Sequence, residues 1–219
     1  MKLFNLDPVE NPYELAEEKF LSCPWPFFDG VPDLAPDSLG YGDFAITRVM
    51  SSGIRNNQIT LALQQAKANR VEKILKAIPV GFDIIGADDA AAERMLVKVD
   101  ALFAALRVRG LAMSRTSKVL CRKRPHCIPM LDNIVTKYLN SVCTRWRADK
   151  VSPEWLEKVW PTWDWQPGPY IRMIREDART HLDELTEIRA RLATVRETGV
   201  PAVASLLRIW EVIVFWPRF

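Results

Sequence analysis

Apolar residues recur at helical spacing along most of this chain, and strand-like alternation is weak throughout. The clearest stripe follows Asp88 and Asp89 and continues at three- and four-residue intervals to Leu106, after which Gly110 closes the segment. Similar patterns predict further helices over residues 8–21, 44–50, 59–65, 70–78, 115–123, 133–142, 170–196 and 202–215. The sequence therefore predicts a compact all-α fold of about ten helices.

Polar and helix-breaking residues mark where these segments begin and end. Asp43, Ser114 and Asp132 each precede an apolar stripe, so each is expected to cap a helix N-terminus. The prolines and glycines of residues 23–43 predict a long ordered loop, and Pro125 ends the helix that Ser114 begins.

Composition narrows the class of protein. The chain has 219 residues, 48% of them hydrophobic and 26% charged, which is typical of a globular domain with a real core. No apolar run approaches the roughly 20 residues of a membrane span, and the acidic N-terminus does not resemble a signal peptide. The four cysteines form no C-x-x-C pair, and only His126 and His181 accompany them, so we expect no metal site of the zinc type. These features predict a cytoplasmic monomer without membrane contact.

The net charge of +3 conceals an uneven distribution. Residues 105–150 contain eleven basic and two acidic residues, a net +9, so the rest of the chain carries −6. The basic residues are Arg107, Arg109, Arg115, Lys118, Arg122, Lys123, Arg124, Lys137, Arg145, Arg147 and Lys150. A basic stretch on an acidic body is typical of a polyanion-binding site, although a solvated charged face that maintains solubility gives the same count.

Residues 106–139 lie within this basic stretch and read as a helix, a tight turn, a second helix, a proline-marked loop and a third helix. A short turn that leads into a helix N-terminus presents free backbone N–H groups, backed by the positive end of the helix dipole. Such a terminus binds phosphate without a charged side chain. The segment therefore predicts a phosphate site at residues 110–117.

The same block, LRVRGLAMSRTSKVLCRKRPHCIPMLDNIVTKYL, resembles the helix-hairpin-helix (HhH-GPD type) DNA glycosylase superfamily. Members of that superfamily carry an L-P-G-x-G-x-x-T/V-A hairpin and, about twenty residues later, a proline-marked loop with a catalytic aspartate. Comparable places are occupied here by Leu106, Gly110, Thr116-Ser117, Pro129 and Asp132. The part RKRPHCIPMLDNIV is also similar to a smaller uncharacterised bacterial family, which we take as a branch of the superfamily.

The resemblance implies a two-lobed helical fold with a helix-hairpin-helix DNA-binding motif. The hairpin lobe is expected at residues 40–145, and residues 1–39 together with 146–219 are expected to form a second helical lobe, with the base pocket between them. The chain departs from the family pattern where bifunctional members place a lysine, because that neighbourhood reads Met113-Ser114-Arg115. The resemblance therefore implies a monofunctional enzyme. No cysteine lies beyond Cys143, so the iron–sulfur cluster of some members is not expected either.

Asp132 is the only carboxylate between Asp100 and Asp149 in the sequence, and nearby cations should keep it ionised. A fixed carboxylate can stabilise the positive charge that develops on deoxyribose when an N-glycosidic bond breaks, and it can orient a water molecule. An aspartate before a helix is also a routine N-cap. The residues alone leave both roles open, and the resemblance assigns catalysis to Asp132.

Two further sets of residues complete the expected site. Duplex DNA is expected to contact the hairpin and its basic exit through Arg107, Arg109, Gly110, Met113, Ser114, Arg115, Thr116, Ser117, Lys118, Arg122, Lys123 and Arg124. The candidates for the wedge that replaces an everted base, or for the wall of the base pocket, are Arg55, Asn56, Asn57, Gln58, Trp163 and Trp165. Turn chemistry explains the asparagines equally well, and the tryptophans can instead staple a proline-rich loop onto the core. No cofactor is expected, apart from a monovalent cation at the hairpin carbonyls that the resemblance implies.

The resulting prediction is a DNA glycosylase that releases a damaged or modified base and leaves an abasic site, in DNA repair or in defence against phages with modified bases. Two alternatives stay open. The chain can be a non-catalytic helix-hairpin-helix DNA-binding module, in which Asp132 is only a cap, or a helical protein whose basic face binds an acidic partner.

Overall fold

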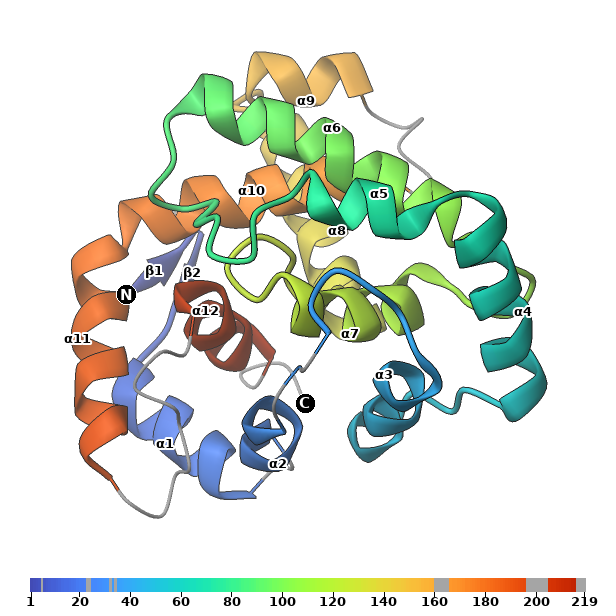
Figure 1. The fold of residues 1–219 in the computed structure, drawn as a ribbon. Coiled ribbons are helices and arrows are strands. Elements are labelled where there is room, and N and C mark those ends of the chain that lie inside the picture. The colour runs from blue at the N-terminus through green and yellow to red at the C-terminus, as the bar shows by residue number, and fades with distance from the viewer. Residues whose placement is uncertain are drawn as a thin grey trace.

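A computed structural model describes residues 1–4, 6–22, 25–31, 33, 35–159, 166–195 and 205–215. Across this part of the chain the fold is helical apart from one two-stranded antiparallel sheet, in which Leu3 pairs with Asp7 (Figure 1). In chain order the elements are β1 (Lys2–Leu3), β2 (Asp7–Pro8), α1 (Pro12–Ser22), α2 (Trp25–Gly30), α3 (Tyr41–Ile46), η1 (Thr47–Met50), α4 (Asn56–Ala68), α5 (Val71–Lys76), α6 (Asp89–Ala105), α7 (Met113–Lys123), α8 (Asn133–Ala148), α9 (Glu154–Val159), α10 (Pro167–Thr180), α11 (Leu182–Thr194) and α12 (Leu206–Phe215). The predicted all-α class is confirmed at this level.

Helix caps explain where the predicted helices begin. Asp88 caps α6 by accepting the Ala91 N–H at 2.7 Å, and Asp132 caps α8, as expected. Asp43 lies inside α3 and accepts the Gly40 N–H, because that helix begins two residues before it. The prediction for Ser114 is wrong, since α7 begins at Met113 after an N-cap alanine that offers no side-chain oxygen.

Two other segments differ from the expected pattern. The short helix α2 lies within residues 23–43, which were expected to be loop. The helix expected over residues 170–196 is divided into α10 and α11 at His181, whose backbone leaves the helical region and serves as the end of one helix and the start of the next.

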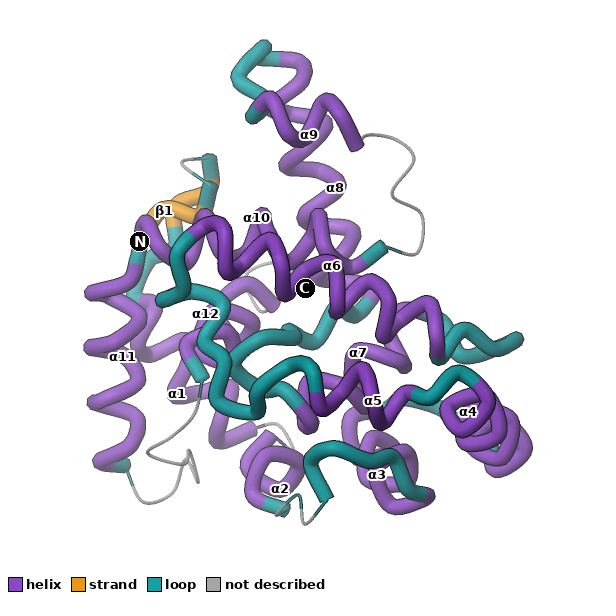
Figure 2. Tube along the Cα trace, turned by 45° about the horizontal axis from the view of Figure 1, so that its top comes forward, coloured by secondary structure: helices purple, strands orange, loops and turns teal. Residues whose placement is uncertain are grey.

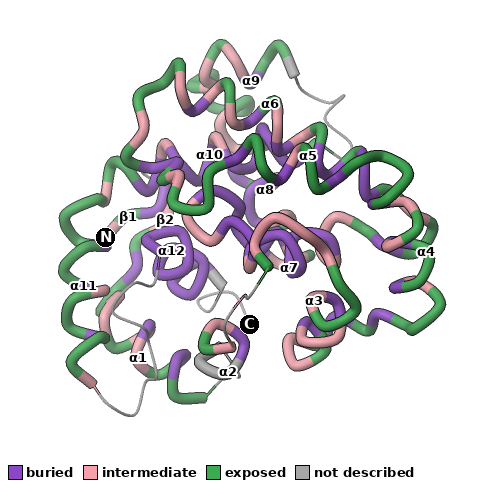
Figure 3. The backbone as a smooth tube through the Cα atoms, in the orientation of Figure 1, coloured by how far each residue is buried: buried purple, intermediate pink, exposed green. Residues whose placement is uncertain are grey.

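Helix α12 lies at the centre of the molecule and packs against α1, α11, α10 and α8 (Figures 1 and 3). Trp210 on this helix is fully buried, and the ring of Phe4 meets it edge-on with the centroids 6.1 Å apart. Phe4 therefore ties the N-terminal sheet to the core.

The apolar side chains form two clusters. A small cluster consists of Phe44, Ile54, Ile59, Ala62, Leu111 and Val119, and it joins α3 and α4 to the start of α7. The large cluster combines residues from the N-terminal segment, from residues 66–143 and from the C-terminal helices. The large cluster thus includes residues on both sides of positions 40 and 145, and the division into two lobes stays a prediction. Seen in Figure 2, α9 and the C-terminal end of α8 project from this body.

Candidate functional site

The connection between α6 and α7 is a tight turn centred on Gly110. Gly110 has a φ of +83°, in the left-handed region that favours glycine. Its carbonyl oxygen accepts hydrogen bonds from Nε2 of Gln58 at 3.2 Å and from the Arg115 guanidinium at 2.6 Å. The structure therefore brings the N-terminal end of α4 and the turn before α7 together, although 52 residues separate Gln58 from Gly110.

We expect Gly110→Ala to destabilise the protein by about 1–2 kcal/mol, because alanine is strained at this φ. A Cβ at this position would also lie 2.3 Å from Nε2 of Gln58 and would break the bond between the two turns. The measurement is the free energy of unfolding by urea.

Gly42→Ala is the matched control for this substitution. Gly42 lies inside α3, and a Cβ there would meet nothing within 4 Å. Alanine should therefore leave stability unchanged or raise it by up to about 1 kcal/mol. Equal unfolding energies for the two variants would contradict the strained turn.

A small polar cavity lies where α7 begins. It has a volume of about 190 Å³ and is lined by Ala112, Met113, Ser114, Leu131, Asn133, Thr136, Asn140 and Tyr170. The N–H groups of Arg115 and Thr116 already bind the Ala112 carbonyl within the helix. The amides of Met113 and Ser114 are the ones that this helix end can offer to an anion, since no side chain caps it.

Asp132 is not itself a lining residue of this cavity, but both of its chain neighbours, Leu131 and Asn133, line it. The side chain is half-buried, and Oδ1 accepts the N–H groups of Ile134 and Val135, each at 2.9 Å. Oδ2 makes no hydrogen bond to any residue that the structure describes. One oxygen therefore caps α8, while the other is left without a hydrogen-bond donor among the described residues.

The loop before Asp132 is held by side chains from two other elements. The Leu131 N–H donates to Oγ of Ser117 on α7 at 2.9 Å, and the Met130 N–H donates to the carboxylate of Glu211 on α12. Glu211 is only 2% exposed, and burial raises its pKa to about 7. These bonds fix the backbone that leads into Asp132.

Arg208 completes this buried group. It binds Glu211, one turn along α12, and its Nε donates to Asp29 at 2.9 Å. Arg208 and Glu211 are not among the site residues predicted from the sequence. The signal that could have found them is a charged pair three residues apart in an otherwise apolar helix.

Lys118 differs from its predicted role as a phosphate contact. It is 8% exposed, and its Nζ donates to the Met50 carbonyl at 2.8 Å. Burial lowers the pKa of its ammonium, and the charge of Asp132 acts in the opposite direction. Lys118 is thus an internal neighbour of Asp132 rather than a surface cation.

The basic residues at the C-terminal end of α7 also bind partners inside the fold. Arg124 is fully buried, and Lys123 is 1% exposed and paired with Asp33 and Asp43 at 2.9 and 2.7 Å. Arg122 is half-buried and donates to the carbonyls of two residues near α2. The assignment of Lys123 and Arg124 to a DNA surface is therefore corrected: their charges pair with Asp33, Asp37 and Asp43 inside the fold.

This internal pairing reduces the basic surface that the sequence suggested. Arg145 binds Asp7 at 2.7 Å and Arg147 lies 3.5 Å from Glu157, so acids from outside residues 105–150 neutralise part of the +9. Within the hairpin, Thr116 and Ser117 are buried. The exposed or half-exposed members of the predicted DNA surface are Arg107, Arg109, Gly110, Met113, Ser114, Arg115 and Arg122. The guanidinium of Arg122 is already bound to the carbonyls of Phe28 and Val31.

The predicted wedge residues differ in whether their side chains form hydrogen bonds within the protein. Asn56 accepts from Tyr41 and Arg48, Asn57 accepts the Gln58 N–H, and Gln58 binds Gly110. Arg55 is exposed, and its guanidinium has no partner among the described residues. Arg55 is thus the member of this set that is free to extend. Trp163 and Trp165 lie outside the described residues.

The chemistry of the hairpin turn does not fit the monovalent cation that the resemblance implies. The Gly110 carbonyl already accepts two donors, one of them cationic. Elsewhere in the described part of the chain, no group of three or more His, Cys, Asp or Glu side chains could hold a metal ion. Cys121, Cys127 and Cys143 are buried, and burial raises the pKa of each thiol to about 12.

Comparison with known proteins identifies the family over nearly the whole chain. The model of a family of unknown function, DUF6308, matches residues 20–218. The chain belongs to DUF6308. The match includes the Gly110 turn, Asp132 and the α12 ion pair, so all parts of the candidate site lie within the family's region. No curated protein matches the chain, and no solved structure matches it. The described helices include none that is long and apolar enough to cross a membrane.

Proposed function

We propose that this chain is a monofunctional DNA glycosylase of the helix-hairpin-helix type. The observation that carries the proposal is Asp132, a half-buried carboxylate whose Oδ1 caps α8 and whose Oδ2 accepts no hydrogen bond from a described residue. Its chain neighbours Leu131 and Asn133 line the cavity at the uncapped N-terminus of α7. A carboxylate needs such fixed placement to act on a short-lived cationic species.

The proposed interface uses the two turns that meet at Gly110. The free amides at the start of α7 bind a phosphate, and Arg107, Arg109 and Arg115 add positive charge around them. Arg55, on the neighbouring turn, fills the space of the everted nucleotide. The cavity of about 190 Å³ is smaller than the roughly 300–1,000 Å³ of drug-sized ligand pockets, so it suits a small group such as one sugar or base ring.

In the proposed reaction, the bond between the base and C1′ of deoxyribose breaks as positive charge develops on the sugar. Oδ2 of Asp132 stabilises that charge and orients a water molecule, which attacks C1′ and delivers its hydroxyl to the sugar. The released base takes up a proton, and an abasic site remains. Lys118 stays a neighbour of Asp132 and forms no covalent bond.

A second function is favoured by a specific observation. The two hydrogen bonds that Oδ1 of Asp132 accepts are those of an ordinary N-cap, and they account for an aspartate at this position without catalysis. The alternative is therefore a DNA-binding module with no reaction.

The test incubates the protein with duplex DNA from hosts and from phages that carry modified bases, then cleaves abasic sites with alkali. Strand breaks that appear only after alkali are the expected result, and they would also show whether host lesions or phage bases are the substrate. Borohydride should trap no protein–DNA adduct. An adduct that disappears in Lys118→Gln would replace water attack by a Schiff-base mechanism, and DNA binding without any base release would establish the binding module.

The proposed interface makes a separate prediction for affinity. Replacing both Arg55 and Arg109 by alanine should weaken duplex binding about tenfold at roughly 0.1 M salt, and should reduce the slope of log K against log salt by nearly two. The control is Arg94→Ala with Arg189→Ala, which removes the same charge from α6 and α11. Equal losses in the two double variants would show general charge attraction and would remove the two turns from the interface.

A further inference from the structure

A second cavity lies at the other end of α8, away from Asp132. Its volume is about 440 Å³, and it is lined by Phe4, Leu6, Trp146, Val151, Pro153, Glu176, Asp177 and Thr180. Along α8, fourteen residues separate Asp132 from Trp146, which corresponds to about 20 Å. The two cavities are therefore independent sites.

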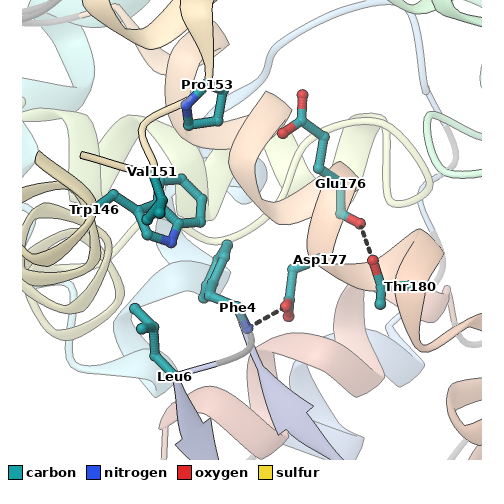
Figure 4. Close-up of a pocket in the computed structure, with 8 residues that line it drawn as sticks. All are labelled: Phe4, Leu6, Trp146, Val151, Pro153, Glu176, Asp177 and Thr180. Atoms are coloured by element: carbon teal, nitrogen blue, oxygen red, sulfur yellow. Dashed lines mark hydrogen bonds between the residues drawn. The ribbon is translucent and has the colours of Figure 1, made fainter. Parts of the chain in front are cut away.

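The walls of this cavity divide into an apolar side and an acidic side (Figure 4). Phe4, Trp146 and Val151 lie opposite the two carboxyl groups of α10, and the carboxyl of Glu176 extends toward Pro153. The rings of Phe4 and Trp146 meet edge-on with centroids 5.5 Å apart, which fixes the aromatic side. Aromatic rings and carboxylates are the groups that recognise an organic cation.

The two carboxyl groups have different roles. Asp177 is an anchor, because its oxygens accept the Phe4 N–H and, at 2.7 Å, the indole N–H of Trp210. Glu176 is half-buried and forms no ion pair with any described residue. The indole N–H of Trp155 lies near the Glu176 carboxyl and lowers its pKa.

The arginine side chains near Glu176 form ion pairs with other acidic residues. Arg172 stacks on Trp155 and pairs with Glu93, while Arg175 pairs with Asp89 at 2.8 Å. These arginines lower the pKa of Glu176, yet burial outweighs them and raises it. The lining contains two acidic groups and no basic one. His181 lies 4.0 Å from Asp177, so Glu176 is the carboxyl group that is left for a positive charge entering the cavity.

We propose that this cavity binds a small organic cation, namely a primary ammonium or guanidinium group on an apolar or aromatic body. Glu176 receives the charge, Asp177 adds negative potential from the floor, and the rings of Phe4 and Trp146 cover the body. The volume lies within the range of about 300–1,000 Å³ in which whole small molecules bind.

The experiment uses the intact chain and three probes of one shape, which are benzylammonium, benzyl alcohol and benzoate. Ligand-observed NMR or calorimetry should give benzylammonium at least about tenfold tighter binding than the alcohol, with no binding of benzoate. Glu176→Gln should abolish that preference. Glu187→Gln, which removes an exposed carboxylate of α11 outside the cavity, should leave it intact.

A steric variant separates the cavity from general charge effects. Val151 is 60% exposed at the edge of the cavity, so Val151→Trp should block the probe without altering the melting temperature. Equal binding of the ammonium and the alcohol, unchanged binding in both Glu176→Gln and Val151→Trp, or no binding of benzylammonium at about 10 mM would each overturn the proposal. Loss of base release in Asp132→Asn has no bearing on this result, so the two proposals fail separately.

Discussion

Asp132→Asn is expected to reduce base release at least about a hundredfold while leaving the melting temperature and duplex affinity unchanged. The reason is that the two carboxylate oxygens of Asp132 have different roles. The amide oxygen of asparagine can still accept the Ile134 and Val135 N–H groups that Oδ1 accepts now. The NH₂ group that replaces Oδ2 carries no negative charge and cannot stabilise a cationic sugar.

The helix cap and the reaction can be separated by a matched pair of variants. Asp88→Asn changes the same cap chemistry at the start of α6, where the carboxylate accepts the Ala91 N–H, and it lies outside the candidate site. Asparagine is about as good an N-cap as aspartate, so both variants should keep full stability, and Asp88→Asn should keep full activity. Asp132→Ala should lose activity and also about 1 kcal/mol of stability.

The measurement is the single-turnover rate of alkali-revealed strand breaks on the best substrate DNA, together with thermal unfolding and a binding titration at fixed salt. Asp132→Asn that cuts as fast as the wild type would show that the carboxylate serves only as a cap. If Asp132→Asn cuts slowly only because it binds DNA weakly, Asp132 contributes to DNA binding and not to the reaction.

Local signals predicted much of the helical frame. Asp88 and Asp132 begin α6 and α8 because their carboxylates satisfy nearby N–H groups, which is a property of a few consecutive residues. The left-handed turn at Gly110 was likewise predictable from one glycine between two helices. The start of α7 was misplaced because Ala112, with no capping side chain, leaves no signal in the sequence.

Pairing over long range was not predictable from local pattern. Lys123 and Arg124 look like the end of a basic DNA-binding helix, but their acidic partners Asp33, Asp37 and Asp43 are 80 to 90 residues away in the sequence. A residue count gives the charge of a segment and not of a surface. The candidate site thus retained Asp132 and the turn, while much of the expected basic face became internal structure.

Arg124→Gln is expected to destabilise the protein by about 3–5 kcal/mol, because several carbonyl groups that the buried guanidinium satisfies lose their donor, at about 1–3 kcal/mol each. The Arg124 guanidinium is fully buried and donates to Asp37 at 2.7 Å, to the Pro36 carbonyl at 2.7 Å, and to the carbonyls of Leu75 and Ile78 at the end of α5. Glutamine supplies one amide in place of this fork and leaves the Asp37 carboxylate without its partner. Loss of the Arg124 guanidinium should therefore release both the loop of residues 35–37 and the end of α5.

Thermal unfolding distinguishes this structural role from the DNA contact that the sequence suggested. For a chain of this size the loss corresponds to a fall in melting temperature of roughly 10 °C, whereas Arg94→Gln, at an exposed arginine on α6, should change stability by less than about 0.5 kcal/mol. Arg124→Lys keeps the charge but not the planar guanidinium, so its loss of stability should lie between those of Arg124→Gln and Arg94→Gln. Duplex affinity is measured on the folded protein at low temperature. If Arg124→Lys has wild-type stability and lower duplex affinity, Arg124 belongs to the DNA interface. If it has a lower melting temperature and unchanged affinity, the charge of Arg124 lies inside the fold.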